Sequence, residues 1–153
     1  LHDALPILRG VFDKNGRCFK CDVAGNDKRY GFHLHREACD EIVVFEGAID
    51  LLSYMTMFPE KQCDLLALGM VADLPLERYL KDHANIRKIV FCMDNDKPGQ
   101  EAEQTLMDKY RGLGYEVIGI CLPQKYKDMN DWLVSERKKV NAINSYSKTG
   151  RKI

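Results

Sequence analysis

Short apolar segments alternate along the chain with longer segments of helical periodicity. The apolar runs at 41–45 and 88–93 are rich in β-branched and aromatic residues, which is typical of strands buried on both faces of a parallel sheet. Two further strands are predicted at 64–68 and 116–122. Because strands that alternate with helices form parallel sheets with right-handed crossovers, the pattern predicts an α/β fold with a central four-stranded parallel sheet flanked by helices.

Helices are predicted at 48–57, 74–82, 100–111 and 130–140. Pro75 and Pro98 suit the first turns of two of these helices, because proline fits the start of a helix better than its interior. The faces expected to pack on the sheet carry Ile49, Leu52 and Met55 or Thr56 in the first helix, and Ala102, Leu106, Met107 and Tyr110 in the third.

The segment before the first parallel strand predicts a small antiparallel β hairpin. Two β-prone stretches, at 11–12 and 18–23, flank turn residues that end in Gly16. The chain is therefore divided into an N-terminal β extension at 8–40, an α/β domain at 41–136 and a basic C-terminal tail or linker at 137–153. Residues 1–7, LHDALPI, resemble a translated sequencing-adapter remnant and are left out of the fold prediction. On that interpretation the chain is a fragment of a larger protein.

The composition narrows the class of protein. The 153 residues can form one compact domain, and 23 Lys and Arg balance 23 Asp and Glu, so any nucleic-acid contact must come from local basic patches. Six cysteines without a dense framework are typical of reduced intracellular thiols. No apolar run approaches the roughly 18 residues that span a bilayer. We therefore expect a soluble, cytoplasmic protein without membrane contact.

Cysteines and histidines in the N-terminal part raise the question of a zinc site. The candidate ligands are Cys18, Cys21, His33, His35 and Cys39. Two cysteines three residues apart on a strand point to opposite faces, whereas structural zinc sites need a turn between paired ligands and a second well-spaced pair. The spacing therefore disfavours zinc in this chain.

Carboxylates cluster where two of the predicted strands end. Asp94 and Asp96 follow the third parallel strand, and Glu46 and Asp50 follow the first. Ligands bind at this edge of open α/β sheets, because strand ends and helix N-termini open there together. A lone Asp-x-Asp pair is more typical of a helix cap or a solvated turn, but a second acidic strand end favours a cation site. The preferred cation is Mg²⁺, with Mn²⁺ as the alternative, because carboxylates and substrate phosphates hold it together.

A third acidic group follows the last predicted strand, which Pro123 ends. Asp128 is therefore a candidate metal ligand, either directly or through water. Asn130 or Asp131 is predicted to cap the helix that comes next.

Four segments together resemble the Toprim domain that bacterial primases, topoisomerases and some nucleases share. They are FEGAID at 45–50, the glycine of LALGM at 69, DNDKPGQEA at 94–102 and KDMND at 127–131. The resemblance spans about 42–133 and implies a Toprim, Rossmann-like fold. Lys97 and Pro98 stand where some topoisomerase versions carry arginine and glutamate, so the pattern looks like the primase branch. With VAGNDKRYGF upstream, it is most similar to primase-like proteins of plasmids and conjugative elements.

This resemblance implies roles for the acidic residues. Glu46 matches the family's glutamate, which acts as a general acid-base or an additional ligand. Asp94 and Asp96, helped by Asp128 and by Asp50, would hold one or two magnesium ions that neutralise phosphate charge. The implied activity is nucleotidyl or phosphoryl transfer on DNA or RNA, in replication or in the transfer of a mobile element.

Glycines and basic residues complete the predicted site. Gly47 and Gly69 would let the backbone approach the ligand closely, and Gly99 belongs to the Pro-Gly break before the third helix. The candidate phosphate contacts are Lys20, Lys28, Arg29, Lys97 and Lys127. The predicted partners are nucleotides and a single-stranded DNA template or primer, with helicase or relaxase domains of the parent protein. The basic tail is a frayed end, a linker or a minor nucleic-acid contact.

Two other functions stay open at this level. A Toprim nuclease or topoisomerase would use the same metals to cleave a phosphodiester, although no strand-passage domain with a nucleophilic tyrosine is evident. A non-catalytic module would bind nucleic acid without turnover, and the complete acidic set argues against it. A zinc module upstream, or a helicase or relaxase domain alongside, would favour the primase-like function.

Overall fold

The computed structural model describes residues 8–12, 14–22, 27–69 and 72–149. Seven strands are present in this part of the chain: β1 Leu8–Phe12, β2 Cys18–Asp22, β3 Phe32–Leu34, β4 Glu41–Phe45, β5 Asp64–Ala67, β6 Lys88–Cys92 and β7 Glu116–Gly119. Four helices accompany them: α1 Ala48–Met57, α2 Leu74–Asp82, α3 Lys97–Gly112 and α4 Met129–Thr149. None of these helices is long and apolar enough to cross a membrane.

The main sheet has five strands in the order β3-β5-β4-β6-β7. Strands β5, β4, β6 and β7 are parallel, which confirms the predicted four-stranded core. The fifth strand, β3, was not predicted and pairs antiparallel with β5 at the sheet edge. It has only three residues, too few for a periodic signal. Gly31 precedes it and lets the chain come close, since a Cβ there would run into the carbonyl oxygen of Ala67.

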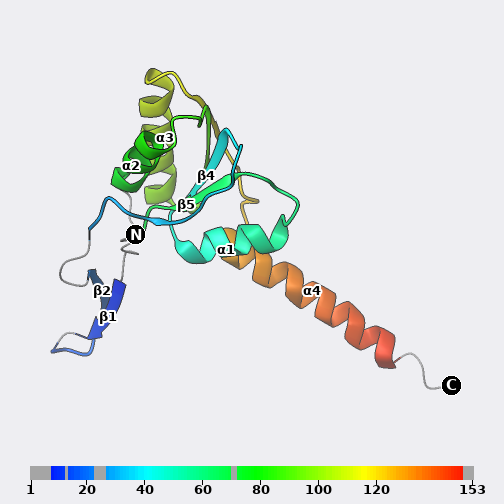
Figure 1. Cartoon of the computed structure of the whole chain (residues 1–153). Coiled ribbons are helices and arrows are strands. Elements are labelled where there is room, and N and C mark those ends of the chain that lie inside the picture. The colour runs from blue at the N-terminus through cyan, green and yellow to red at the C-terminus, as the bar shows by residue number, and fades with distance from the viewer. Residues whose placement is uncertain (1–7, 13, 23–26, 70–71, 150–153) are drawn as a thin grey trace.

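Both faces of the sheet are covered, α2 and α3 lying on one and α1 with the start of α4 on the other (Figure 1). Alternate residues of the central strand β4 supply the two cores. Ile42 and Val44 pack with the helix residue Tyr110, while Val43 and Phe45 pack with Leu51. Burial of both faces explains why β4 and β6 read as continuous apolar runs, as predicted.

The inward face of α1 differs from the prediction. Ile49 and Leu52 are 60% and 45% exposed, whereas Leu51 and Tyr54 are buried. Helix α1 is apolar on several sides, so periodicity alone did not select the correct face. Contact with α4 helps to fix the rotation, because Ser53 Oγ lies 3.3 Å from Oδ1 of Asn130. On α3 the predicted face is confirmed, since Leu106 and Tyr110 are buried.

Helix α4 begins at Met129 and projects away from the sheet (Figure 1). Oδ1 of Asp128 accepts a 2.7 Å hydrogen bond from the backbone N–H of Asp131, which is the geometry of an N-terminal cap. The predicted cap, Asn130 or Asp131, is therefore wrong, because the helix starts one residue earlier than the sequence pattern indicated.

The first two strands form the predicted hairpin, with Leu8 paired to Asp22 and Phe12 to Cys18. Gly16 lies in its turn with a φ of 75°, a left-handed value that glycine adopts at little cost. The side chains of both strands, including those of Cys18, Cys21 and Lys20, lie outside the described residues.

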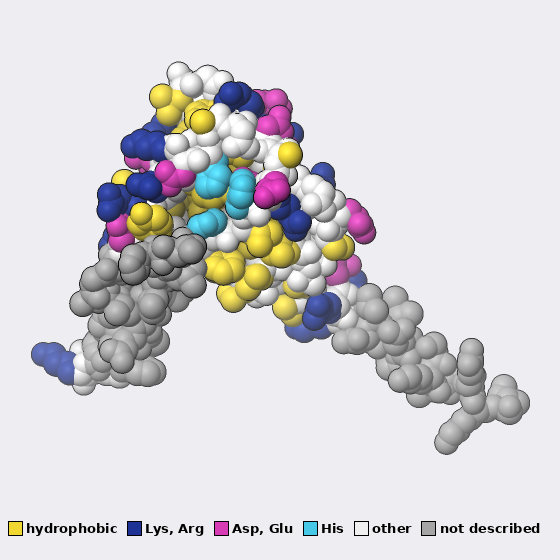
Figure 2. Space-filling view, in the orientation of Figure 1, with side chains coloured by type: hydrophobic (Ala, Val, Ile, Leu, Met, Phe, Trp, Pro, Cys, Tyr) yellow, Lys and Arg dark blue, Asp and Glu magenta, His cyan; other side chains and the backbone are white. Residues whose placement is uncertain are grey.

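A buried carboxylate joins β3, β5 and α2. Asp64 is fully buried and accepts hydrogen bonds from the hydroxyl of Tyr79 at 2.8 Å and the backbone N–H of Arg36 at 2.7 Å. Nδ1 of His35 lies 3.1 Å from the same carboxylate. Figure 2 shows histidine side chains gathered on this face of the molecule. These partners satisfy a charge that would otherwise be costly to bury.

Candidate active site

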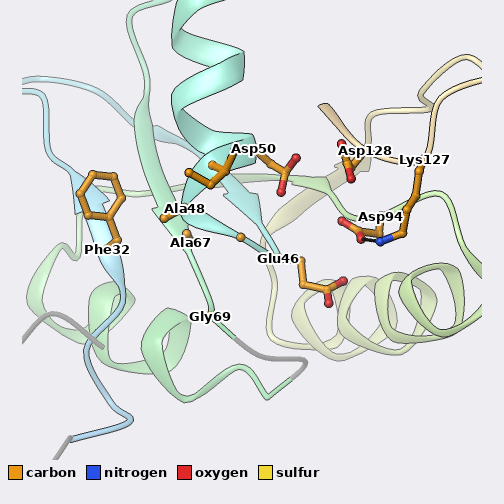
Figure 3. A pocket seen from close by; sticks show the side chains of 11 residues that line it. Phe32, Glu46, Ala48, Asp50, Ala67, Gly69, Asp94, Lys127 and Asp128 are labelled. Carbon is orange, nitrogen blue, oxygen red and sulfur yellow. Dashed lines mark hydrogen bonds and ion pairs between the residues drawn. The ribbon is translucent and has the colours of Figure 1, made fainter. Parts of the chain in front are cut away.

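A cavity of about 480 Å³ opens at the carboxyl ends of β4 and β5, beside the first turn of α1 (Figure 3). Loops that follow β6 and β7 form its opposite wall. The edge is thus the one at which open α/β sheets bind ligands. Its lining residues are Phe32, Glu46, Gly47, Ala48, Ile49, Asp50, Ala67, Gly69, Asp94, Lys127 and Asp128.

Glu46 follows the last residue of β4 and lies between the two walls in Figure 3. Its carbonyl oxygen accepts a 2.9 Å hydrogen bond from the N–H of Gly69, which ties the ends of β4 and β5 together. Gly69 has a φ of 74°, so a side chain at this turn would be strained. Burial raises the pKa of Glu46, and the charges of Asp94 and Asp96 raise it further against the opposing effect of Lys127.

Asp94 meets a lysine from the opposite loop. Nζ of Lys127 lies 2.9 Å from Oδ2 of Asp94 and 3.8 Å from Oδ2 of Asp96. The backbone supports this contact, because the N–H of Asn95 donates a 2.6 Å hydrogen bond to the carbonyl of Lys127. Asp94 is 16% exposed and Lys127 60% exposed, so the ammonium is the more accessible partner. The loops after β6 and β7 therefore present one ion pair to the cavity.

Asp96 caps helix α3 in addition to carrying a charge at this edge. Its Oδ1 accepts a 3.0 Å hydrogen bond from the N–H of Gly99 and caps α3. Gly99 is buried against the preceding loop, and a Cβ there would run into the carbonyl oxygen of Asp94. Gly99 was predicted as a structural glycine, and the structure shows that it lets α3 pack closely against the end of β6. Asp96 lies near Lys127 but does not line the cavity.

Asp50 and Asp128 lie on the wall where α1 meets the start of α4. Oδ1 of Asp50 accepts a 3.1 Å hydrogen bond from the backbone N–H of Asn130. Burial raises the pKa of Asp50, the Asn130 bond opposes that rise, and Asp128 and Asp94 add to it. Gly47 leaves room for this carboxylate, since a Cβ at Gly47 would lie 2.9 Å from its Oδ2.

The carboxylates of this cavity suit a hard cation that also binds water and phosphate oxygens. In the described part of the chain, no group of three or more acidic, histidine or cysteine side chains is gathered closely enough to hold a metal ion. Mg²⁺ does not require such a cage, because it uses one or two carboxylates with water and phosphate oxygens. The Lys127 ammonium lies beside Asp94, and burial, followed by the charges of Asp94 and Asp96, raises the pKa of Glu46, so carboxylates outnumber the positive charge at this edge. These residues therefore fit Mg²⁺.

Among the predicted basic contacts whose side chains the structure describes, only Lys127 lines the cavity. Arg29 forms an ion pair with Asp27 at 2.6 Å, which lowers the pKa of Asp27 to about 2. Lys97 is 87% exposed, and its nearest ion-pair partner is Glu101 at 3.7 Å. Lys28 is exposed in the loop that leads to β3.

Sequence reasoning missed the apolar wall of the cavity. Phe32 reaches it from the unpredicted strand β3, next to Ala67 of β5. Ile49 was assigned to the core but lies on the rim. The only available signal was the short apolar pair at 32 and 34, because a three-residue edge strand has no clear periodicity.

Residues 43–133 match the Toprim-like family. The chain belongs to that family. The matched segment begins within β4 and includes every residue of the acidic site described above. Among curated proteins, no sequence matches this Toprim-like chain.

Solved structures show the same fold. The primase fragment of the bacteriophage T7 primase-helicase protein superimposes with a TM-score of 0.59 at 20% identity, over 85% of this chain and 52% of that one. T7 primase domains in a complex with lagging-strand DNA polymerase superimpose with a TM-score of 0.59 at 20% identity, over 87% of this chain and 66% of that one. The Aquifex aeolicus primase, with its zinc-binding and RNA polymerase domains, superimposes with a TM-score of 0.54 at 20% identity, over 88% of this chain and 34% of that one. The Toprim-like chain thus spans about half the length of the T7 primase fragment.

Proposed function

We propose that this Toprim-like chain is the catalytic core of a primase-like enzyme that joins nucleotides on a single-stranded nucleic-acid template with Mg²⁺. The observation that carries the proposal is the cavity in which Glu46, Asp94 and Lys127 meet at the carboxyl edge of the sheet. Support also comes from the T7 complex, whose primase domains are bound to an RNA/DNA hybrid and dTTP. Mn²⁺ is the expected substitute metal.

Asp94 would hold the metal, with Asp96 and Asp128 as further oxygen donors and Asp50 at the back of the site. When bound, Mg²⁺ supplies charge neutralisation of the phosphates and polarises the oxygens that attack and leave. Lys127 would bind a phosphate oxygen, because its ammonium is exposed and lies at the cavity wall. Lys28, Arg29, Lys20 and Lys97 would contact the nucleic-acid backbone outside the cavity.

Glu46 would act as the general base that takes the proton from an attacking hydroxyl. Its carboxylate lines the cavity, and burial together with Asp94 and Asp96 raises its pKa. A carboxylate with a raised pKa holds the transferred proton better, and general bases work best when their pKa is near the operating pH. Glycine at 47 keeps the neighbouring backbone open to the substrate.

The test is primer synthesis by the complete protein that carries this chain, with Mg²⁺, nucleoside triphosphates and single-stranded DNA. Glu46→Gln keeps the shape and removes the base, so product formation should fall by about a hundred-fold or more. Glu60→Gln, an exposed glutamate after α1, is the matched control and should leave the rate unchanged. Wild-type rates with Glu46→Gln would remove Glu46 from the mechanism.

The same reaction separates the other two functions. Metal-dependent shortening of a labelled strand without extension would replace synthesis by phosphodiester cleavage. Binding of the strand without either product, at any concentration of Mg²⁺ or Mn²⁺, would instead assign a non-catalytic nucleic-acid module.

A further inference from the structure

The cavity of the candidate active site has two chemically different ends. Charged side chains, among them Asp94 and Lys127, line one end. The other end is lined by four apolar residues, which we call the apolar wall: Phe32, Ala48, Ile49 and Ala67. In Figure 3, Phe32 lies on the opposite side of the cavity from the Asp94–Lys127 ion pair. A ligand that fills this volume must therefore combine a charged end with an apolar end.

Three separate elements build the apolar wall. Phe32 belongs to β3 and pairs with Ala67 of β5, and the other two residues belong to the first turn of α1. Phe32 packs only partly against the core, and Ile49 is 60% exposed. The two large side chains of the wall thus retain apolar surface that a ligand in the cavity can cover.

The apolar wall can hold a ring by its faces but not by its edges. None of its four side chains carries a hydrogen-bond donor or acceptor. Aromatic side chains bind nucleic-acid bases by stacking, and this contact tolerates any base, because every base has a π-face. The wall is therefore suited to a planar apolar group whose exact edge pattern does not matter.

We propose that the apolar wall binds the base of a nucleoside triphosphate, with the base against Phe32 and Ile49 and the phosphates at the charged end. This assignment rests on the proposed function and adds to it a site for the base. The phosphates lie at Lys127, whose ammonium is exposed, and beside Asp94, the expected metal ligand. A wall that accepts all four bases is what extension along a template requires, since the template and not the cavity then selects the nucleotide.

The experiment compares two ligands that share a phosphate chain. Equilibrium dialysis of the whole chain with Mn²⁺ measures the binding of each of ATP, GTP, CTP and UTP, and of tripolyphosphate, which has no base. Phe32→Leu keeps an apolar side chain but removes the ring, so it should weaken the binding of all four nucleotides by about three-fold or more. The affinity for tripolyphosphate should not change, because this ligand reaches only the charged end.

Helix α1 offers a matched pair of variants. Ile49→Ala alters an exposed residue of the apolar wall, so the fold should be retained, and the binding of the nucleotides should weaken by about two-fold or more. Leu52→Ala is the control, because Leu52 is 45% exposed on the same helix but does not line the cavity. Lys127→Gln provides the opposite reference, since it should weaken the binding of tripolyphosphate and nucleotides together.

Unchanged nucleotide affinity in Ile49→Ala and in a folded Phe32→Leu would overturn the inference. So would an equal loss of affinity for tripolyphosphate, or a loss confined to one base. If the two variants instead weakened only the binding of single-stranded oligo(dT), the wall would hold a template base and the inference would be wrong.

The outcome is separate from that of the proposed function. Base-dependent binding through the apolar wall, in a complete protein that extends no strand, keeps the nucleotide site and loses the primase-like activity. Strand extension by a protein whose nucleotide affinity does not depend on the wall keeps the activity and loses the site.

Discussion

The ammonium of Lys127 lies 2.9 Å from a carboxylate oxygen of Asp94, so a residue of the protein supplies positive charge to the acidic site. The two residues come from loops after different strands, and an Asn95–Lys127 backbone hydrogen bond holds those loops together. Asp94 raises the pKa of Lys127, so the lysine stays charged at neutral pH. A divalent cation that binds Asp94 must therefore compete with this ammonium.

Lys127→Gln should accordingly strengthen metal binding while weakening nucleotide binding. The gain in Mn²⁺ affinity should be at most about five-fold, because an ion pair this exposed contributes no more than about 1 kcal/mol. Titration calorimetry with Mn²⁺ alone, and then with a nucleoside triphosphate and Mn²⁺, measures the two effects. The control is Lys125→Gln, an exposed lysine of the same loop that lies over the Tyr126 ring. Weaker Mn²⁺ binding by Lys127→Gln would show that the lysine supports the metal instead of competing with it.

Gly99 and Gly112, at the two ends of α3, give opposite expectations for the same substitution. Gly99→Ala places a Cβ against the backbone of Asp94 and should destabilise the fold by about 1 to 3 kcal/mol, as overpacking of a buried contact does. At Gly112 a Cβ meets nothing within 4 Å, so Gly112→Ala should be neutral or stabilise by up to about 1 kcal/mol. Urea unfolding monitored by circular dichroism measures both changes. Equal effects of the two substitutions would contradict the assigned packing role of Gly99.

The parallel strands and their order along the chain could be predicted because both faces of the sheet are covered. Strands β4 and β6 are therefore apolar at nearly every position, and the carboxylates after them had to lie at one edge. The glycine in the turn after β5 was equally informative, since its left-handed φ fits the predicted turn. These features depend on local sequence alone.

The remaining features depend on contacts between distant segments. Strand β3 exists because Gly31 lets three residues pair with β5, and no local pattern reports that approach. Ile49 lies on the cavity rim because α4 fixes the rotation of α1. The Asp50–Asn130 bond between these helices joins residues that are 80 positions apart in the chain. The buried Oε1 of Glu103 on α3, which has no hydrogen-bond partner among the described residues, gave no signal either, since an acidic residue in a helix is usually solvated.

Glu103 also predicts how stability depends on pH. Burial raises its pKa in the folded state, so the folded protein binds a proton more tightly than the unfolded chain does. Stability should therefore be highest below the ordinary glutamate pKa and fall as the pH rises from about 4.5 through the raised value. Glu103→Gln removes this loss and should raise Tm at pH 7. Scanning calorimetry of the wild type and Glu103→Gln from pH 4 to pH 8 tests this prediction. A Tm difference between them that does not grow with pH would contradict a raised pKa of Glu103 in the folded protein.

Asp96 combines two roles that substitution can separate. Its Oδ1 caps α3, while its Oδ2 lies 3.8 Å from the ammonium of Lys127 at the acidic site. Serine is also a good N-cap but carries no charge, so Asp96→Ser should retain most of the stability of the wild type. Asp96→Ala loses the cap and should cost about 1 kcal/mol.

If Asp96 is also a metal donor, both variants should lose the same part of the Mn²⁺-induced rise in Tm, although their stabilities without metal differ. Binding to the folded state alone raises Tm by mass action, so this rise reports the metal site and not the cap. Asp94→Asn provides the reference for a full loss, and Asp108→Asn, on the solvent side of α3, for no loss. A wild-type response to Mn²⁺ by Asp96→Ser would leave Asp96 as a helix cap only. The metal would then rest on Asp94 with Glu46 or Asp128, the carboxylates that share the cavity with it.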